Sequence, residues 1–346
     1  MGIWFPETPQ WVWALSSIVM MGLINLIAVK VFGEFEFWFA LIKVVAIIAM
    51  IALGGSVILF GFTNDWQPIG LSNLWQHGGF FPNGISGMLL SLQMVLFAYV
   101  GIEMIGLSAG EAENPKKTIP MAIDSLAWRI LIFYMGAILV ILAIFPWNEV
   151  GQQGSPFVVM FERIGLREAA GLINFVVITA ALSSCNAGIF SGGRLLYSLS
   201  NNGYAPVSFA RLSKYGVPHR AVIATVVVSM TGVVLNYFVP DKAFHYIMAA
   251  VTFIGLMVWI AILFTQIKFR RSLTQVQVAE LAYRTPWYPY SSWFALAFIF
   301  LVVVLMGFHE DARIALILGP CLLAVFLVMF YIVGLHHKTK NNREFK

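Results

Sequence analysis

The sequence predicts an all-α, polytopic membrane protein with nine transmembrane helices. Two observations lead to this fold class. The 346 residues are 60% hydrophobic and only 11% charged, whereas soluble domains carry roughly 25% charged residues. The apolar residues also gather in long stretches, separated by short connectors rich in Gly, Pro, Asn and Ser. One globule cannot bury so much apolar surface, so we expect the remainder to face lipid.

The nine helices are predicted from the lengths of the apolar stretches. A helix needs about 20 mostly apolar residues to cross roughly 30 Å of hydrocarbon. The stretches that meet or nearly meet this requirement are residues 11–31, 38–61, 85–108, 127–146, 168–197, 219–239, 243–268, 289–307 and 312–335. Turn-forming strings separate several of these stretches. The connector after the second stretch contains both NDWQPIG and HGGFFPNG, and later connectors contain ENPKKTIP, GQQGSPF, NNGYAPVS and YRTPWYPY. We expect residues 1–346 to fold as a single transmembrane domain.

The basic residues predict how the chain is oriented in the membrane. Cytoplasmic loops hold an excess of Lys and Arg. Placing the C-terminus in the cytoplasm puts sixteen of the 21 basic residues on that side, with Lys43 inside a span and four residues outside: Arg163, Arg167, Lys242 and Arg313. The N-terminus then lies outside, although residues 1–10 contain no export signal. An odd number of earlier spans, missing from this sequence, would explain such a start.

Lys43 lies a turn or more inside the second predicted span, with apolar residues on both sides. An ionisable side chain at that depth is costly, so it indicates a functional site. The alternative is a lysine that extends to the cytoplasmic interface, because Trp38 and the connector GEFEF are only a few residues away. Burial alone does not separate these two interpretations.

The third predicted span combines a carboxylate, Glu103, with the glycines Gly101, Gly106 and Gly110. Glycines weaken a helix. Interrupted backbone at membrane depth is tolerated only where it lines a cavity or is buried in protein, and broken helices mark the binding site in many secondary transporters. Alternatively, the glycines permit close helix packing and Glu103 is a structural partner of a polar neighbour.

A polar cluster occupies the middle of the fifth predicted span. Its members are Thr179, Ser183, Ser184 and Asn186. Hydroxyl groups at such spacing can bind a cation or accept a hydrogen bond from an ammonium group. They can also bond back to their own helix, which is the more common use. Taken alone, the cluster therefore favours a structural role.

Several function classes are excluded by what the sequence lacks. It has no GxSxG, HExxH or Walker motif, and its six histidines lie in or near connectors. Cys185 and Cys321 are far apart within apolar stretches, so we expect them to be packing residues and not metal ligands. The basic residues sit in short tracts and not in one cluster, which argues against nucleic acid as a partner. We predict a protein without enzymatic activity, cofactor or metal, whose surroundings are the lipid bilayer.

Five strings carry a resemblance to a known family: VKVFGEFEFWFALIKV, FAYVGIEMIGLSAGEAENPKKTIP, FPWNEVGQQGSPFV, INFVVITAALSSCNAGIFSGGRLLY and EDARIAL. In this order they resemble the amino-acid transporter branch of the amino acid, polyamine and organocation permeases, and in particular bacterial permeases for proline, threonine and serine, or glycine, alanine and D-serine. Family members have twelve spans in a LeuT-like arrangement of two inverted repeats plus two extra helices. The nine spans here match the fourth to the twelfth, so the resemblance implies that the first three are missing.

The resemblance assigns a substrate-binding role to the broken span. It implies that carbonyl groups around Phe97, Ala98, Tyr99 and Val100 accept hydrogen bonds from the ammonium group of an amino acid substrate. Gly101 would permit the unwinding, Glu103 would fix the broken segment, and Tyr99 could act as an aromatic gate.

The resemblance also assigns a proton-coupling role to Lys43. In proton-coupled relatives a lysine of this span faces hydroxyl groups of a later span, and Ser183 and Ser184 occupy the matching positions. By alternating between charged and neutral forms, such a lysine could bias inward and outward states. The resemblance thus implies proton-coupled import of a small neutral amino acid across the bacterial cytoplasmic membrane. Two alternatives stay open: a non-transporting, truncated remnant of such a permease, and a membrane channel or scaffold.

Overall fold

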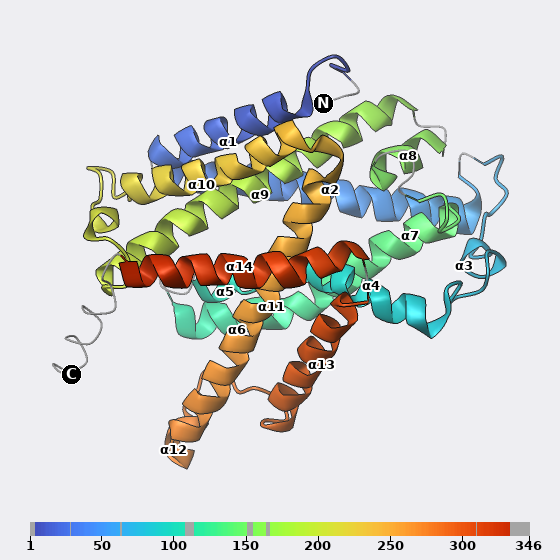
Figure 1. Ribbon diagram of the computed structural model, residues 1–346. Coiled ribbons are helices and arrows are strands. Elements are labelled where there is room, and N and C mark those ends of the chain that lie inside the picture. Colours follow the sequence, from blue (N-terminus) through green and yellow to red (C-terminus); the bar gives the residue numbers. More distant parts are fainter. Residues whose placement is uncertain are drawn as a thin grey trace. The chain divides into compact units, whose positions relative to one another are not determined.

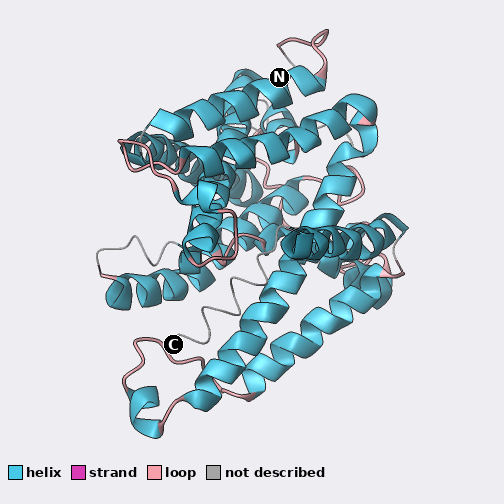
Figure 2. Cartoon of the chain, turned by 60° about the vertical axis from the view of Figure 1, so that its left-hand side comes forward, coloured by secondary structure: helices cyan, strands magenta, loops and turns pink. Residues whose placement is uncertain are grey.

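The computed structural model describes residues 4–27, 29–62, 64–107, 114–150, 155–163, 167–308 and 310–332. Within these residues the chain is helical and contains no strand (Figure 2). This confirms the predicted all-α fold class. Eight helices of the described part are long and apolar enough to cross a membrane, and Tyr290–Met306 is a shorter apolar helix. Helices suit this environment because each pairs its backbone N–H and C=O groups within itself.

The described helices follow the predicted spans in order (Figure 1). In the first half of the chain they are α1 (Gln10–Ile27), α2 (Val29–Phe60), α3 (Asn73–Gln76), α4 (Gly84–Tyr99), α5 (Met104–Leu107), α6 (Pro115–Arg129), η2 (Ile130–Met135) and α7 (Gly136–Ile144). In the second half they are α8 (Pro156–Arg163), α9 (Arg167–Asn201), η3 (Val207–Ala210), α10 (His219–Phe238), α11 (Pro240–Ser272), α12 (Gln275–Ala279), α13 (Tyr290–Met306) and α14 (Glu310–Ile332).

Two of the predicted spans are not single regular helices. The third is interrupted between α4 and α5, where the sequence predicts a weakened helix. The fourth contains the π-helical segment η2 between α6 and α7. Segments of this kind insert an extra residue per turn and occur often at functional sites.

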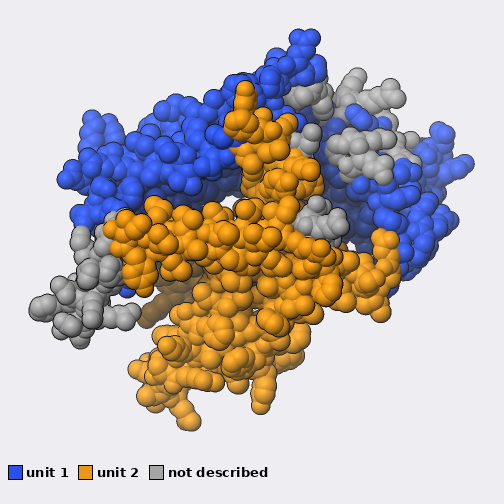
Figure 3. All heavy atoms as spheres, viewed as in Figure 1, with its two compact units in different colours: residues 1–82, 126–234, 337–346 blue, residues 83–125, 235–336 orange. Residues whose placement is uncertain are grey.

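The chain divides into two compact units (Figure 3), and it crosses between them before α4, inside α6, inside α10 and after α14. Unit 1 comprises residues 1–82, 126–234 and 337–346, and unit 2 comprises residues 83–125 and 235–336. Whether residues 1–346 act as a single domain stays a prediction. The basic C-terminal tail, which supports the predicted cytoplasmic C-terminus, lies outside the described residues.

Unit 1 is built around α9, which packs against α1, α2 and α8. One apolar cluster includes Met50 of α2, Ala143 of α7 and Met160 of α8. A second joins α1, α9 and α10 through residues such as Met21 and Ile189. Full burial of these side chains holds the helices side by side, and this fixes the polar residues of α9 against α2.

Unit 2 is built around α11, which packs against α4, α13 and α14. Its core contains Phe253 and Leu256 of α11, Val302 of α13 and Ala315 of α14, all less than 9% exposed.

The two cysteines lie in different surroundings. Cys185 is partly buried against the α1, α9 and α10 cluster of unit 1, whereas Cys321 is exposed, so the prediction of a packing role is wrong for Cys321.

Candidate functional site

One face of α9 carries a row of buried polar side chains. Thr179, Ser183 and Asn186 are 4%, 1% and 0% exposed. Their spacing of four and then three residues places them on the same side of a helix. Unit 1 therefore contains a polar stripe inside an otherwise apolar set of helices, and polar side chains in such a place need partners.

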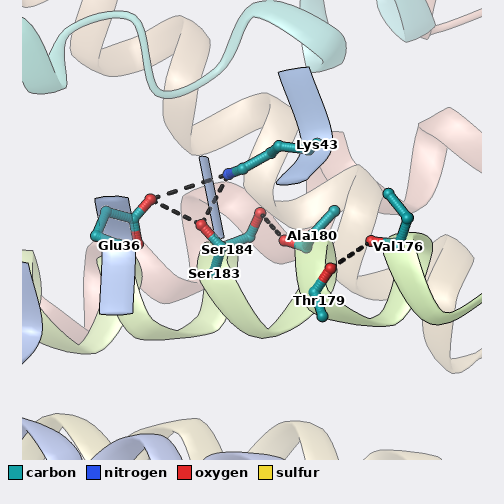
Figure 4. Close-up of polar contacts among 7 residues, drawn as sticks. All are labelled: Glu36, Lys43, Val176, Thr179, Ala180, Ser183 and Ser184. Carbon is teal, nitrogen blue, oxygen red and sulfur yellow. Dashed lines mark hydrogen bonds and ion pairs between the residues drawn. The ribbon is translucent and has the colours of Figure 1, made fainter. Parts of the chain in front are cut away.

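The partner of Ser183 is Lys43 of α2 (Figure 4). The Lys43 Nζ atom donates a hydrogen bond to Ser183 Oγ over 2.7 Å. Ser183 Oγ in turn donates to Glu36 Oε1, also over 2.7 Å. Lys43 Nζ and Glu36 Oε1 are 3.9 Å apart, and both side chains are 30% exposed. An ammonium group, a hydroxyl group and a carboxylate thus form one connected set across two helices.

This geometry favours one of the two interpretations of Lys43. A lysine that extends to the interface would direct its ammonium group along the helix toward water. Instead, the ammonium group reaches across to the buried hydroxyl of Ser183 on α9. The contact links α2 with α9, so a change in the charge of Lys43 would act directly on the packing of the two helices.

The other hydroxyl groups of the predicted cluster bond to their own helix (Figure 4). Ser184 Oγ is exposed and donates to the Ala180 carbonyl over 3.1 Å, and Thr179 Oγ1 donates to the Val176 carbonyl over 2.8 Å. These bonds match the common structural use of Ser and Thr in membrane helices. Among the described residues, no contact supports the proton-coupling role that the family resemblance implies for Ser184, and that role stays a prediction.

The stripe continues one turn further along α9 with a pair of amides. Asn25 Nδ2 of α1 donates to Asn186 Oδ1 over 2.8 Å and to the Met21 carbonyl over 2.8 Å. Both asparagines are at least 95% buried. Asn25 Oδ1 and Asn186 Nδ2 have no hydrogen-bond partner within the described residues. The pair ties α1 to α9 beside the Ser183 contact.

Lys43 also borders a pocket of about 240 Å³ within unit 1. The pocket extends from Lys43 along the next two turns of α2 and the preceding turns of α9, and α8 contributes to it. Apart from Lys43 and Ser155, its lining side chains are apolar: Ala46, Ile47, Met50, Pro156, Phe157, Phe161, Ile173, Val176, Val177 and Ala180. Lys43 therefore stands between an apolar pocket and a polar contact.

The predicted break in the third span lies in unit 2, between Tyr99 and Met104. Val100 leaves the helix with φ −59° and ψ 129°, and Gly101 has a φ of +109°. L-amino acids with a side chain adopt such a positive φ only with strain. The backbone conformation explains why glycine occupies position 101, since a Cβ atom there would meet no atom within 4 Å.

Glu103 holds the broken segment together. Its Oε2 atom accepts a hydrogen bond from the Gly101 backbone N–H over 3.0 Å and another from Trp259 Nε1 of α11 over 3.0 Å. Gly255 lies one turn before Trp259, and a Cβ atom there would come within 2.9 Å of Val100. The same face of α11 therefore contacts both sides of the break.

Two carbonyl groups of the predicted substrate contact accept backbone bonds inside the break. The Phe97 carbonyl accepts from the Val100 N–H over 3.1 Å, and the Tyr99 carbonyl accepts from the Ile102 N–H over 3.3 Å. A carbonyl oxygen has two lone pairs, so each can accept a second bond. These bonds shape the segment from 97 to 102.

Sequence reasoning missed three residues of these arrangements: Glu36, Trp259 and Asn25. Glu36 was placed in a connector because the predicted span begins at residue 38, yet α2 begins at Val29. Its spacing of seven residues from Lys43, two helical turns, was a signal that could have revealed it. Trp259 had no comparable signal, because its contact with Glu103 joins residues 156 positions apart.

Comparisons with known proteins give a consistent result. The sequence model of the amino acid permease family matches residues 1–345. In Bacillus subtilis strain 168, the chain is 52% identical to the uncharacterized amino acid permease YtnA and 48% identical to the probable threonine/serine transporter YbxG. Each alignment covers 98% of this chain and 73% of the relative. The amino-acid permease AapA of the same organism is 42% identical over 94% of this chain and 71% of its own length.

Proposed function

This chain belongs to the amino acid permease family, and from that premise we propose that it imports a small neutral amino acid together with a proton by alternating access. The family and the transporter relatives make it a multi-pass membrane protein of amino acid transport in the bacterial plasma membrane. The finer statements, namely the substrate, the coupling ion and the residues, are the proposal.

The observation that carries the proposal is the Lys43 contact with Ser183. A partly buried cation beside a buried hydroxyl group inside a transporter is in a position to exchange a proton. When Lys43 is charged, it holds α2 against α9 through a charge-assisted hydrogen bond of 2.7 Å. When it is neutral, that contact weakens. A proton can then shift the balance between two conformations, because it binds one of them better.

The broken span supports the proposed substrate contact. An amino acid presents an ammonium group, and the carbonyl groups near Phe97, Ala98, Tyr99 and Val100 are acceptors for it. The Gly101 conformation and the two hydrogen bonds to Glu103 keep these acceptors in place before the substrate arrives. A preorganised site loses less entropy on binding than a flexible one.

The substrate class is proposed from the relatives. YbxG is a probable threonine/serine transporter, and the family resemblance also includes permeases for proline, glycine, alanine and D-serine. All of these are small and neutral. We therefore expect one or more members of this group to be transported.

Uptake by proteoliposomes tests the proposal. The purified chain is reconstituted, an acidic exterior is imposed, and uptake is measured with radiolabelled glycine, L-alanine, L-serine, L-threonine, L-proline and D-serine. We expect at least one to accumulate above equilibrium, and we expect a protonophore to abolish this accumulation. Lys43→Ala should lose accumulation as well, whereas Lys242→Ala, which changes an exposed lysine, should retain it.

Two results would contradict the proposal. Uptake that persists unchanged in Lys43→Ala and after collapse of the pH gradient would rule out proton coupling through that residue. No uptake of any amino acid of the panel would favour the alternatives of a non-transporting remnant or a channel.

A further inference from the structure

We propose that Glu36 receives the proton that Lys43 releases, with the Ser183 hydroxyl group as the relay between them. This inference rests on the proposed function, because it extends proton coupling from Lys43 to a second titratable group. It assigns a role to a carboxylate that the sequence placed in a connector.

The two hydrogen bonds among the three residues run in the same direction, from donor to acceptor, starting at Lys43 and ending at Glu36. Lys43 Nζ donates to Ser183 Oγ, and Ser183 Oγ donates to Glu36 Oε1, each over 2.7 Å. A hydroxyl group that accepts one hydrogen bond and donates another can transfer a proton from its donor to its acceptor. The direct distance from Lys43 Nζ to Glu36 Oε1 is 3.9 Å, which is longer than a hydrogen bond. The path through Ser183 is therefore the better connected one.

The transfer conserves atoms and charge. One N–H bond of the Lys43 ammonium group breaks, and its proton forms a new O–H bond on Ser183. The original O–H bond of Ser183 breaks, and that proton forms an O–H bond on Glu36. An ammonium group and a carboxylate become a neutral amine and a neutral carboxylic acid, so the net charge of the three residues is unchanged. Glu36 then releases its proton to water, and Lys43 takes up the next one.

The surroundings of Lys43 give the transfer a direction. On the side of Ala46, Ile47 and Met50, Lys43 meets the apolar pocket of about 240 Å³. Apolar side chains have no group that can accept a proton from Lys43. On the other side stand Ser183 and Glu36. The polar exit from Lys43 therefore leads to Glu36.

That exit leads toward the cytoplasm in the orientation predicted from the basic residues. Glu36 lies seven residues before Lys43 on α2, a rise of about 10 Å toward the N-terminal end of the helix. The predicted orientation places this end of α2 on the cytoplasmic side. A proton that enters with the substrate from outside would thus leave Lys43 in the inward direction.

Glu36 has unused capacity to bind a proton or a donor. Its Oε2 atom is buried and has no hydrogen-bond partner within the described residues. Within the described residues, the carboxylate accepts a hydrogen bond from Ser183 and forms an ion pair with Lys43. Loss of the charge on Lys43 would remove this ion pair.

Few other titratable groups face this set. On α2 the nearest is Glu34, which is exposed. The helices α1 and α7, which also pack against α2, contain no titratable side chain within their bounds. The titratable side chains that the structure describes on α9 are Cys185, Arg194 and Tyr197.

Three variants test the relay: Glu36→Gln, Ser183→Ala and, as a matched control, Glu34→Gln. Each is reconstituted with the panel amino acid that wild type takes up fastest, in radiolabelled form, and with a pH-sensitive dye in the lumen. Exchange of internal for external amino acid is measured without a gradient, and accumulation and lumen acidification are measured with one. We expect Glu36→Gln and Ser183→Ala to exchange at a measurable rate. Their ratio of accumulation to exchange should fall roughly 10²-fold, the lower end of the contribution of a positioned proton donor or acceptor.

The outcomes separate this inference from the proposed function. If Lys43→Ala loses accumulation but Glu36→Gln accumulates and acidifies like Glu34→Gln, the relay is wrong and the role of Lys43 stands. If Lys43→Ala also behaves like wild type, the proposed function itself fails. If Glu36→Gln cannot be inserted or loses exchange and accumulation together, Ser183→Ala decides. Accumulation and acidification at wild-type levels in Ser183→Ala would overturn the relay.

Discussion

At the scale of single residues, Gly101 has the strictest backbone requirement in the broken span. Its φ of +109° is strained for any residue with a Cβ atom. We predict that Gly101→Ala destabilises the break by about 1–3 kcal/mol and raises the KM for the transported amino acid. Gly106→Ala is the control, because position 106 lies in α5 and has open space around it. Equal thermal stability and KM in the two variants would contradict the assigned role of Gly101.

Within the described part of the chain, Glu103 accepts a side-chain hydrogen bond from one other helix, through Trp259 of α11. Trp259→Phe keeps an aromatic ring but removes the N–H group. Since a hydrogen bond to a charged group contributes about 1.5–3 kcal/mol, we expect a clear drop in the thermal unfolding temperature of the detergent-solubilised protein. Trp293→Phe changes an exposed tryptophan of α13 and should leave that temperature nearly unchanged. An equal drop in both variants would mean that the bond to Glu103 contributes little.

At the scale of helices, close packing of α9 against α10 depends on glycines. A Cβ atom at Gly192 would lie 2.7 Å from Thr225, whereas one at Gly188, a turn earlier on α9, would meet nothing within 4 Å. Gly192→Leu should therefore destabilise the protein by about 1–3 kcal/mol through overpacking. Gly188→Leu should be tolerated. Thermal unfolding of the two variants side by side measures the difference, and a more stable Gly192→Leu protein would contradict the described contact.

The helices also explain which parts of the site the sequence could predict. Hydropathy placed most of the spans within a few residues, because the apolar requirement of lipid is local and can be counted. It began the second and fourth spans late, at residues 38 and 127, since charged residues lower hydropathy, although the helices begin at Val29 and Pro115. A helix does not have to end where the hydrocarbon ends. For this reason Glu36 fell outside the predicted span and was not recognised as a site residue. Lys43 and Ser183 lie inside apolar stretches, where a polar residue is conspicuous.

The tertiary contacts were harder to predict. Periodicity places Ser183 and Asn186 on one face of α9, but it cannot say which helix covers that face. The pairing of Ser183 with Lys43 followed from family resemblance, and the Asn25 contact with Asn186 was not predicted at all. Its partners are 161 residues apart and neither carries a charge that would mark it.

At the scale of the whole molecule, the excess of basic residues predicts which loops face the cytoplasm. Two glutamines at exposed positions provide a matched test: Gln76 in α3 and Gln275 in α12. In a background of Cys185→Ala and Cys321→Ala, we predict that Gln76→Cys reacts with a membrane-impermeant maleimide in intact cells. Gln275→Cys should react only after permeabilisation. The reverse pattern would invert the orientation, and with it the proposed direction of proton release through Glu36.

The proposed function requires that amino acid and proton move together through this chain. The most direct measurement records both in the same proteoliposomes, with a radiolabelled amino acid outside and a pH-sensitive dye inside, and without an imposed gradient. Wild type should acidify the lumen as the amino acid enters, and Lys43→Ala should not. Entry of the amino acid without acidification in wild type, or equal acidification in Lys43→Ala, would contradict the proposed coupling.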